Sequence, residues 1–118
     1  MFLDRLRSIS ERIHGTLALG LVAGDGIPVE SVKNDPDVDL EALSAELLAQ
    51  VRTISDDHRE LHVGTVKQLT VTTDERTFIV SQLSNDYYLL LVLSDPRSYG
   101  RARFELRRAR LLFEDDLA

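Results

Sequence analysis

The residues that could carry out chemistry are few, and the first candidates are two histidines. His58 and His62 stand four positions apart, the spacing that places two imidazoles on one face of a helix. However, the acidic pair Asp56-Asp57 and the strand-like pattern of Leu61–Val63 indicate that a helix ends between the two histidines. We therefore interpret them as surface or loop residues rather than as a pair of metal ligands.

Three alternating aspartates, Asp35, Asp37 and Asp39, partly match a calcium-binding loop. The glycine that such a loop has at its sixth position is missing, and so is the closing bidentate glutamate. A better explanation is that Asp39 caps the helix that follows it, while its neighbours keep the loop polar. We expect no metal site here.

Motifs for nucleophilic catalysis and phosphate binding are also missing. The segment Gly24-Asp25-Gly26 lies between two apolar runs, and neither the helix nor the lysine of a phosphate-binding loop follows it. No serine stands in a G-x-S-x-G turn, and the chain has no cysteine for a nucleophile, a disulfide, a thiolate zinc site or an iron–sulfur cluster. We therefore expect a protein that is not an enzyme and that holds no cofactor.

The size and charge of the chain narrow its class further. Its 118 residues suit a single domain over 1–118. The net charge of −6 disfavours unspecific binding to nucleic acid. No apolar run is long enough for a membrane span and no signal peptide is evident, so we expect a cytoplasmic protein.

The arginine-rich end of the chain leaves an alternative open. A basic surface of this kind could bind nucleic acid or acidic lipid. We favour the interpretation that these long side chains cover apolar surface and pair with carboxylates such as Glu105 and Glu114. The residues concerned are Arg97, Arg101, Arg103, Arg107, Arg108 and Arg110.

Hydrophobic periodicity predicts the elements that position these residues. Helical spacing and turn signals predict helices over 2–13, 40–56 and 97–114, and strands over 16–23, 27–32, 61–73, 76–83 and 87–93. The strands 16–23 and 87–93 are apolar on both faces, which favours the centre of a sheet. Pro28 and Glu30 are typical of a protected edge. The expected fold is α+β, a five-stranded antiparallel sheet with helices on both faces, in the order α-β-β-α-β-β-β-α.

This order, with the residues that punctuate it, resembles the roadblock (dynein light chain) family from about Gly15 to Leu112. The best local match is the strand Leu17–Ala23 followed by Asp25-Gly26-Ile27-Pro28-Val29, which is similar to the first hairpin of the family. Supporting matches are the helix Leu40–Ile54, the apolar strand Leu89–Val92 and the arginine-rich helix after Asp95-Pro96. Profilin-like, longin and sensor-type sheets share parts of this order, so topology alone does not decide between them.

The resemblance implies a small non-catalytic protein that pairs through its third strand (Leu61–Thr73) and its second helix (Leu40–Ser55) into a continuous sheet. Roadblock proteins serve as platforms for partners, notably Ras-like small GTPases. Bacterial gliding-motility regulators are similar short, single-domain members that stimulate a cognate GTPase. We therefore expect a bacterial homodimeric adaptor that binds a Ras-like small GTPase and modulates its nucleotide cycle or location.

The residues independently favour dimerisation along one edge. The predicted strand 61–73 lacks proline and has only Lys67 to protect it, so its backbone groups would attract another strand. Pairing with a second copy along Val66–Val71 would satisfy them. Small side chains on a second flank of helix 40–56 would let another backbone approach. The candidate interface is Val66, Gln68, Leu69, Thr70, Val71, Ala45, Leu48 and Ala49, and the candidate GTPase contacts are Arg52 and Arg59.

Two alternatives remain open from the sequence. The chain could be a small-ligand-sensing module with a profilin-like or sensor-like sheet, which needs a pocket with converging polar groups. It could also be a purely structural dimerising scaffold that binds no GTPase.

Overall fold

Among the described residues, three helices and five strands follow one another in the predicted order α-β-β-α-β-β-β-α, with one short 3-10 turn before the last helix. The computed structural model describes residues 2–117 except 85 and 95, and the side chains of 58, 59 and 115–117 lie outside this description. The elements are α1 (Phe2–Arg12), β1 (Thr16–Ala23), β2 (Pro28–Lys33), α2 (Leu40–Leu61), β3 (Gln68–Thr72), β4 (Thr77–Gln82), β5 (Tyr87–Leu93), η1 (Pro96–Ser98) and α3 (Tyr99–Leu117).

The strands form one antiparallel sheet in the order β2-β1-β5-β4-β3. The prediction that β1 and β5 lie in the interior and that β2 and β3 form the edges is confirmed. Residues on both faces of β5 are fully buried from Leu89 to Leu93, because helices cover the sheet on each side. This is why the strand is apolar at every position.

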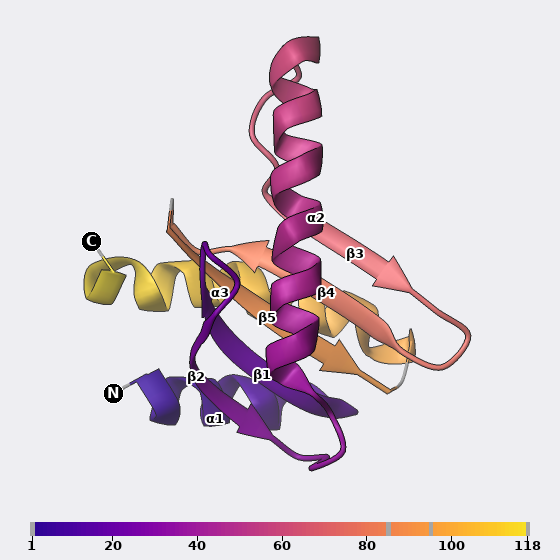
Figure 1. Ribbon diagram of the computed structural model, residues 1–118. Helices are drawn as coiled ribbons and strands as arrows, with labels where there is room; N and C mark the ends of the chain where they lie inside the picture. The colour runs from indigo at the N-terminus through magenta and orange to yellow at the C-terminus, as the bar shows by residue number, and fades with distance from the viewer. Residues whose placement is uncertain (1, 85, 95, 118) are drawn as a thin grey trace.

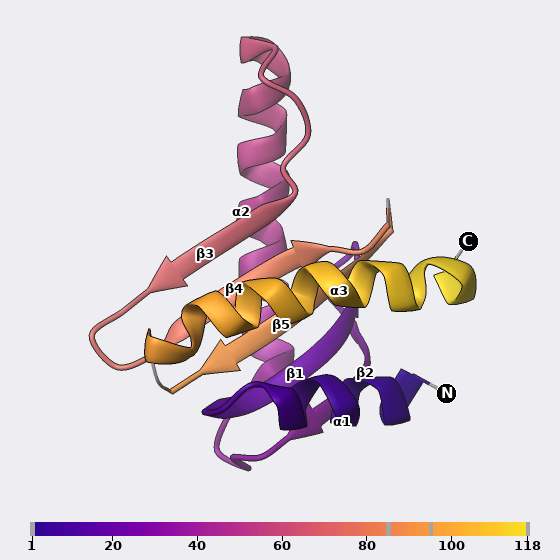
Figure 2. The same ribbon diagram turned by 180° about the vertical axis from the view of Figure 1, so that it is seen from behind.

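Each face of the sheet has its own core. On one face α1 and α3 lie side by side, and their apolar stripes enclose Leu19, Leu91 and Phe113 (Figure 2). On the other face α2 alone packs on the sheet over Ala18, Val80 and Leu90 (Figure 1). The fold is therefore three layers, with the sheet between the pair of helices and the single helix.

A buried carboxylate joins the two helices of the first layer. Glu105 on α3 is 2% exposed, and its carboxylate oxygens lie 3.3 Å from Arg101 and 3.4 Å from Arg108. Arg12, at the end of α1, approaches the same carboxylate at 4.0 Å. The predicted pairing of the α3 arginines with Glu105 is thereby confirmed, and it ties α1 to α3.

The predicted boundary between the second helix and the third strand is wrong. The helix continues to Leu61 rather than ending near residue 56, and β3 covers only Gln68–Thr72. His62 and Gly64 have positive φ angles of 58° and 102°, which end the helix and turn the chain back. Leu61 and Val63 are 68% and 64% exposed. Leu61 is the exposed last residue of α2 and Val63 lies in an exposed connection, so their alternation does not mark a strand.

Candidate interaction surface

The outer edge of β3 carries a row of backbone groups without a partner in the described part of the chain. Lys67 accepts a hydrogen bond from the Gln82 amide, and the Thr73 amide donates to Arg76, so both residues face the neighbouring strand. The register between β3 and β4 is unbroken. Because backbone groups alternate along an antiparallel strand, those of Gln68, Thr70 and Thr72 face away from the sheet.

Side chains on both sides of this edge are only half-buried. Leu69 and Val71 pack against the core under α2, together with Val66 from the preceding segment. On the opposite face, the hydroxyl of Thr70 lies 3.5 Å from that of Tyr99 on α3. The edge is thus apolar on its α2 side and polar on its α3 side.

The small-residue flank of α2 faces the β1–β2 hairpin instead of β3. Gly26 has a φ of 90°, and a Cβ atom there would lie 3.1 Å from the Cα of Ala45. Leu48 is fully buried beside the same glycine. The close backbone approach that these residues permit is therefore used within the chain. Leu48 is therefore covered by its own chain, whereas Ala45 is exposed beside the hairpin.

The buried face of α2 shows how the helix is rotated on the sheet. Ser44 and Leu48 are fully buried, whereas Leu43 and Ile54 are half-buried. Figures 1 and 2 show α2 passing between the β1–β2 hairpin and β3. Since the hairpin occupies one flank, the opposite flank, which carries Leu43 and Ile54, faces the side of β3. Ala49 lies one turn after Ala45 and is half-buried on the hairpin flank.

The C-terminal part of α2 projects beyond the sheet (Figure 1). The connection to β3 returns beside it, so this part of the helix has little of its own chain to pack against. An amphipathic helix end without a core of its own depends on some further contact for stability. The projecting end and the β3 edge lie on the same side of the molecule.

The predicted GTPase-contact arginines are both placed on α2. Arg52 is exposed, and its Nη1 donates a hydrogen bond to the carbonyl oxygen of Gly24 at 2.9 Å. The side chain of Arg59 lies outside the described residues. Arg52 thus connects the helix to the β1–β2 hairpin, in addition to being accessible at the surface.

The hairpin that Asp25-Gly26 marks is confirmed, and its turn contains three residues. The amide of Ala23 donates to the Ile27 carbonyl, and that of Gly26 donates to the Ala23 carbonyl. This pattern, with the glycine in the left-handed region, is that of a three-residue loop with a bulge. The Asp25 side chain accepts a hydrogen bond from the Ile27 amide at 3.0 Å.

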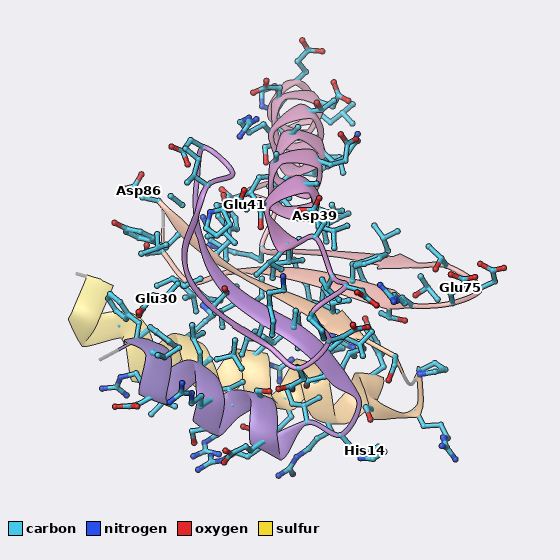
Figure 3. All side chains as sticks on the ribbon, turned by 60° about the horizontal axis from the view of Figure 1, so that its bottom comes forward. His14, Glu30, Asp39, Glu41, Glu75 and Asp86 are labelled. Atoms are coloured by element: carbon cyan, nitrogen blue, oxygen red, sulfur yellow. The ribbon has the colours of Figure 1, made fainter. Side chains whose placement is uncertain are left out.

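The aspartates first considered as calcium ligands have structural roles. Asp39 accepts a hydrogen bond from the Ala42 amide, which confirms it as the cap of α2. Asp35 accepts one from the Asp37 amide and pairs with Arg76 at 3.7 Å. His14, at the end of α1, lies apart from the carboxylates labelled in Figure 3. No group of three or more potential metal ligands gathers among the described residues.

The cores also limit what the sheet could bind. The central strands bury apolar side chains on both faces under the helices of the chain itself. Within the described residues, no helix combines the length and the apolar character that crossing a membrane requires.

Comparisons with known proteins identify the fold. A Roadblock/LC7 domain from Streptomyces avermitilis superposes with a TM-score of 0.82 at 17% identity, covering 95% of this chain and 93% of its own. MglC from Myxococcus xanthus gives a TM-score of 0.70 at 28% identity, with 98% of each chain covered. An MglB in a tetrameric arrangement gives 0.83 at 13% identity, covering 92% of this chain and 81% of its own.

No protein-family model matches the chain, and no curated protein sequence does. The structural neighbours are nevertheless Roadblock/LC7 domains and the proteins MglB and MglC. The resemblance to the roadblock family is therefore confirmed in the fold, an α+β sheet of five antiparallel strands with three helices.

Proposed function

We propose that this protein is a non-catalytic homodimeric adaptor that binds a Ras-like small GTPase and modulates its nucleotide cycle or its location. The single observation that carries the proposal is the outer edge of β3, where the backbone groups of Gln68, Thr70 and Thr72 face away from the sheet. A bare edge of this kind is an open template for another strand. A second copy of the same edge is a self-complementary partner.

In the proposed dimer, β3 pairs with β3 of a second copy about a two-fold axis, and the two sheets become continuous. Val66, Leu69 and Val71 then lie under the paired α2 helices and become buried. The helical part of the interface is the flank with Leu43 and Ile54, together with the projecting end of α2. This assignment replaces the small-residue flank, which the hairpin occupies. One neighbour, MglB, is known in a tetrameric arrangement, which supports self-association as a property of this fold.

The GTPase partner rests on the resemblance to roadblock proteins and on the likeness to MglC and MglB. We place its contact on the α2 side, where Arg52 and Arg59 are carried by one exposed helix. An arginine there could stabilise phosphate charge on a bound GTPase in trans. We further propose a bacterial protein that acts in the cytoplasm.

The test is a binding assay with the Ras-like GTPases of the source organism, beginning with any that is encoded beside this chain. Each GTPase is loaded with GDP or a GTP analogue and passed over the immobilised protein. The proposal predicts that one GTPase binds with a preference for one nucleotide state. Binding to none of them in either state would overturn the GTPase role and favour a structural scaffold.

A matched pair of variants separates an arginine acting in trans from a simple docking role. Arg52→Ala should reduce stimulation of GTP hydrolysis, whereas Arg7→Ala, on α1 across the sheet, should not. If Arg52→Ala leaves both binding and hydrolysis unchanged, Arg52 is not a contact residue.

A further inference from the structure

The closing helix α3 carries arginines on two flanks that differ in how their charge is balanced. Arg101 and Arg108 face α1, where both pair with the buried carboxylate of Glu105. The other flank repeats arginine at positions 103, 107 and 110. Steps of four and three residues keep these side chains on one side of the helix.

The second flank borders a pocket between α3 and the β3 edge. The pocket has a volume of about 270 Å³ and is lined by Lys67, Gln68, Ser81, Arg103, Arg107 and Arg110. It is therefore built from three elements: the start of β3 with the residue before it, β4, and α3. Because it opens on the face of the sheet that carries α3, in-plane pairing of the β3 edges leaves it accessible.

The charge around this pocket is one-sided. Four of its lining residues are cations and none is an acid, although the whole chain has a net charge of −6. Within the described part of the chain, no ion pair joins Arg103, Arg107 or Arg110 to a carboxylate. Like charges at helical neighbour positions repel one another. Arg103 stacks over the Tyr99 ring, with its Cζ 5.7 Å from the ring centroid. Arg107 and Arg110, in contrast to the arginines of the Glu105 flank, form no ion pair among the described residues.

The remaining groups in the pocket are also suited to an anion. The Gln68 amide and the Ser81 hydroxyl can donate hydrogen bonds beside the cations. Arginine forks bind phosphate oxygens through two parallel hydrogen bonds. Ligand pockets commonly measure about 300–1,000 Å³, so a pocket just below this range suits only a compact anion with several charges.

We propose that the pocket between α3 and β3 binds a diphosphate group. Arg107 and Arg110 hold its charged oxygens from the helix, and Ser81 donates from the floor. Lys67 lies at the rim, where its Nζ donates a hydrogen bond to Gln82 Oε1 at 3.3 Å, so it adds positive charge rather than a direct contact. The proposal is independent of the dimer and of the GTPase, since every lining residue belongs to one chain.

The test is isothermal titration calorimetry of the purified protein with inorganic pyrophosphate at low ionic strength. The double variant Arg107→Gln with Arg110→Gln should bind at least about tenfold more weakly, because it removes two charge-assisted hydrogen-bond donors. The control, Arg7→Gln with Lys33→Gln, removes the same charge from exposed positions outside the pocket and should bind like the parent protein. Circular dichroism checks that both variants are folded.

Amide chemical shifts locate the binding. Pyrophosphate should shift the amide signals of Gln68, Ser81 and Arg107 before others. The proposal is overturned if pyrophosphate does not bind at millimolar concentration, if the two double variants bind equally, or if the shifts cluster elsewhere. A parallel titration with ADP shows whether the diphosphate group belongs to a nucleotide. If ADP binds more tightly than pyrophosphate, the pocket recognises a nucleotide. If ADP binds more weakly, the pocket recognises a free diphosphate.

Discussion

Arg52 on α2 donates a hydrogen bond from Nη1 to the backbone carbonyl of Gly24, 2.9 Å away in the β1–β2 loop. Nearer the start of the helix, Gly26 of the same loop lies against Ala45. The helix and the hairpin are therefore fixed to one another at two points. This contact determines how α2 is rotated on the sheet and which of its flanks is left for a partner.

The contact between Gly26 and Ala45 gives the first prediction. Gly26→Ala should lower the free energy of unfolding by about 1–3 kcal/mol, because alanine is strained at a φ of 90° and its Cβ would lie 3.1 Å from Ala45. Urea unfolding followed by circular dichroism measures the change. Gly100→Ala is the matched control, since a Cβ at Gly100 meets nothing within 4 Å and alanine favours a helix. Equal stability of the two variants would contradict the account.

Arg52 should matter less for stability than for binding. Arg52→Ala removes one exposed hydrogen bond and should lower the free energy of unfolding by no more than about 1 kcal/mol. The same urea titration checks this against Arg7→Ala, which should lie within about 0.5 kcal/mol of the parent protein. A loss of several kcal/mol would show that Arg52 is chiefly structural, and any effect on a GTPase would then need another explanation.

The buried carboxylate of Glu105 gives a third prediction. Glu105→Gln should destabilise the protein by about 1–2 kcal/mol, because Arg12, Arg101 and Arg108 lose their shared partner but stay partly solvated. The exposed Glu114→Gln, on the same helix, should change stability by less than about 0.5 kcal/mol. Thermal unfolding of both variants decides the point. If the glutamine variants melt alike, Glu105 does not hold α1 to α3.

The strands whose faces are both buried could be predicted from the sequence. β1 and β5 have the predicted bounds, because a strand that is buried on both faces is apolar along its whole length and its ends are visible in the sequence. The β1–β2 hairpin was also predictable from Asp25-Gly26, because a left-handed glycine position is a local requirement. The capping role of Asp39 was predictable for the same reason, because its hydrogen-bond partner is the nearby Ala42 amide.

Features that depend on distant contacts could not be predicted. The contact of α2 with the β1–β2 hairpin depends on the fit of Gly26 against Ala45, two residues that no local pattern connects. The end of α2 was missed because Leu61, His62 and Val63 alternate like a strand, although Leu61 ends the helix and the other two residues lie in an exposed connection. The basic pocket forms only because α3 lies beside β3 in the fold. From the sequence, Arg107 and Arg110 therefore predicted a basic helix surface but no pocket.

A proline at the β3 edge tests the proposed dimer. Thr70→Pro removes an amide that faces away from the sheet, so the hydrogen bonds to β4 are kept while pairing with a second copy is blocked. Light scattering at tens of micromolar should give a monomer mass near 13.3 kDa for this variant and a dimer mass for the parent protein.

The control for that variant is Ser31→Pro on the opposite edge. The Asn34 amide donates to Leu17, and the β1–β2 register is regular between Lys33 and Glu30. Ser31 therefore also faces outward, and its variant should remain a dimer. Dissociation caused by Ser31→Pro and not by Thr70→Pro would place the interface on β2 instead.

Amide hydrogen exchange at Thr70 tests the central claim, pairing through β3, most directly. In the dimer its amide donates to a second copy, and it should be protected to the same degree as the amides of Leu69 and Val71, which face β4. Nuclear magnetic resonance at high protein concentration resolves the three residues separately. Fast exchange at Thr70, with Leu69 and Val71 protected, would show a bare edge and contradict the account.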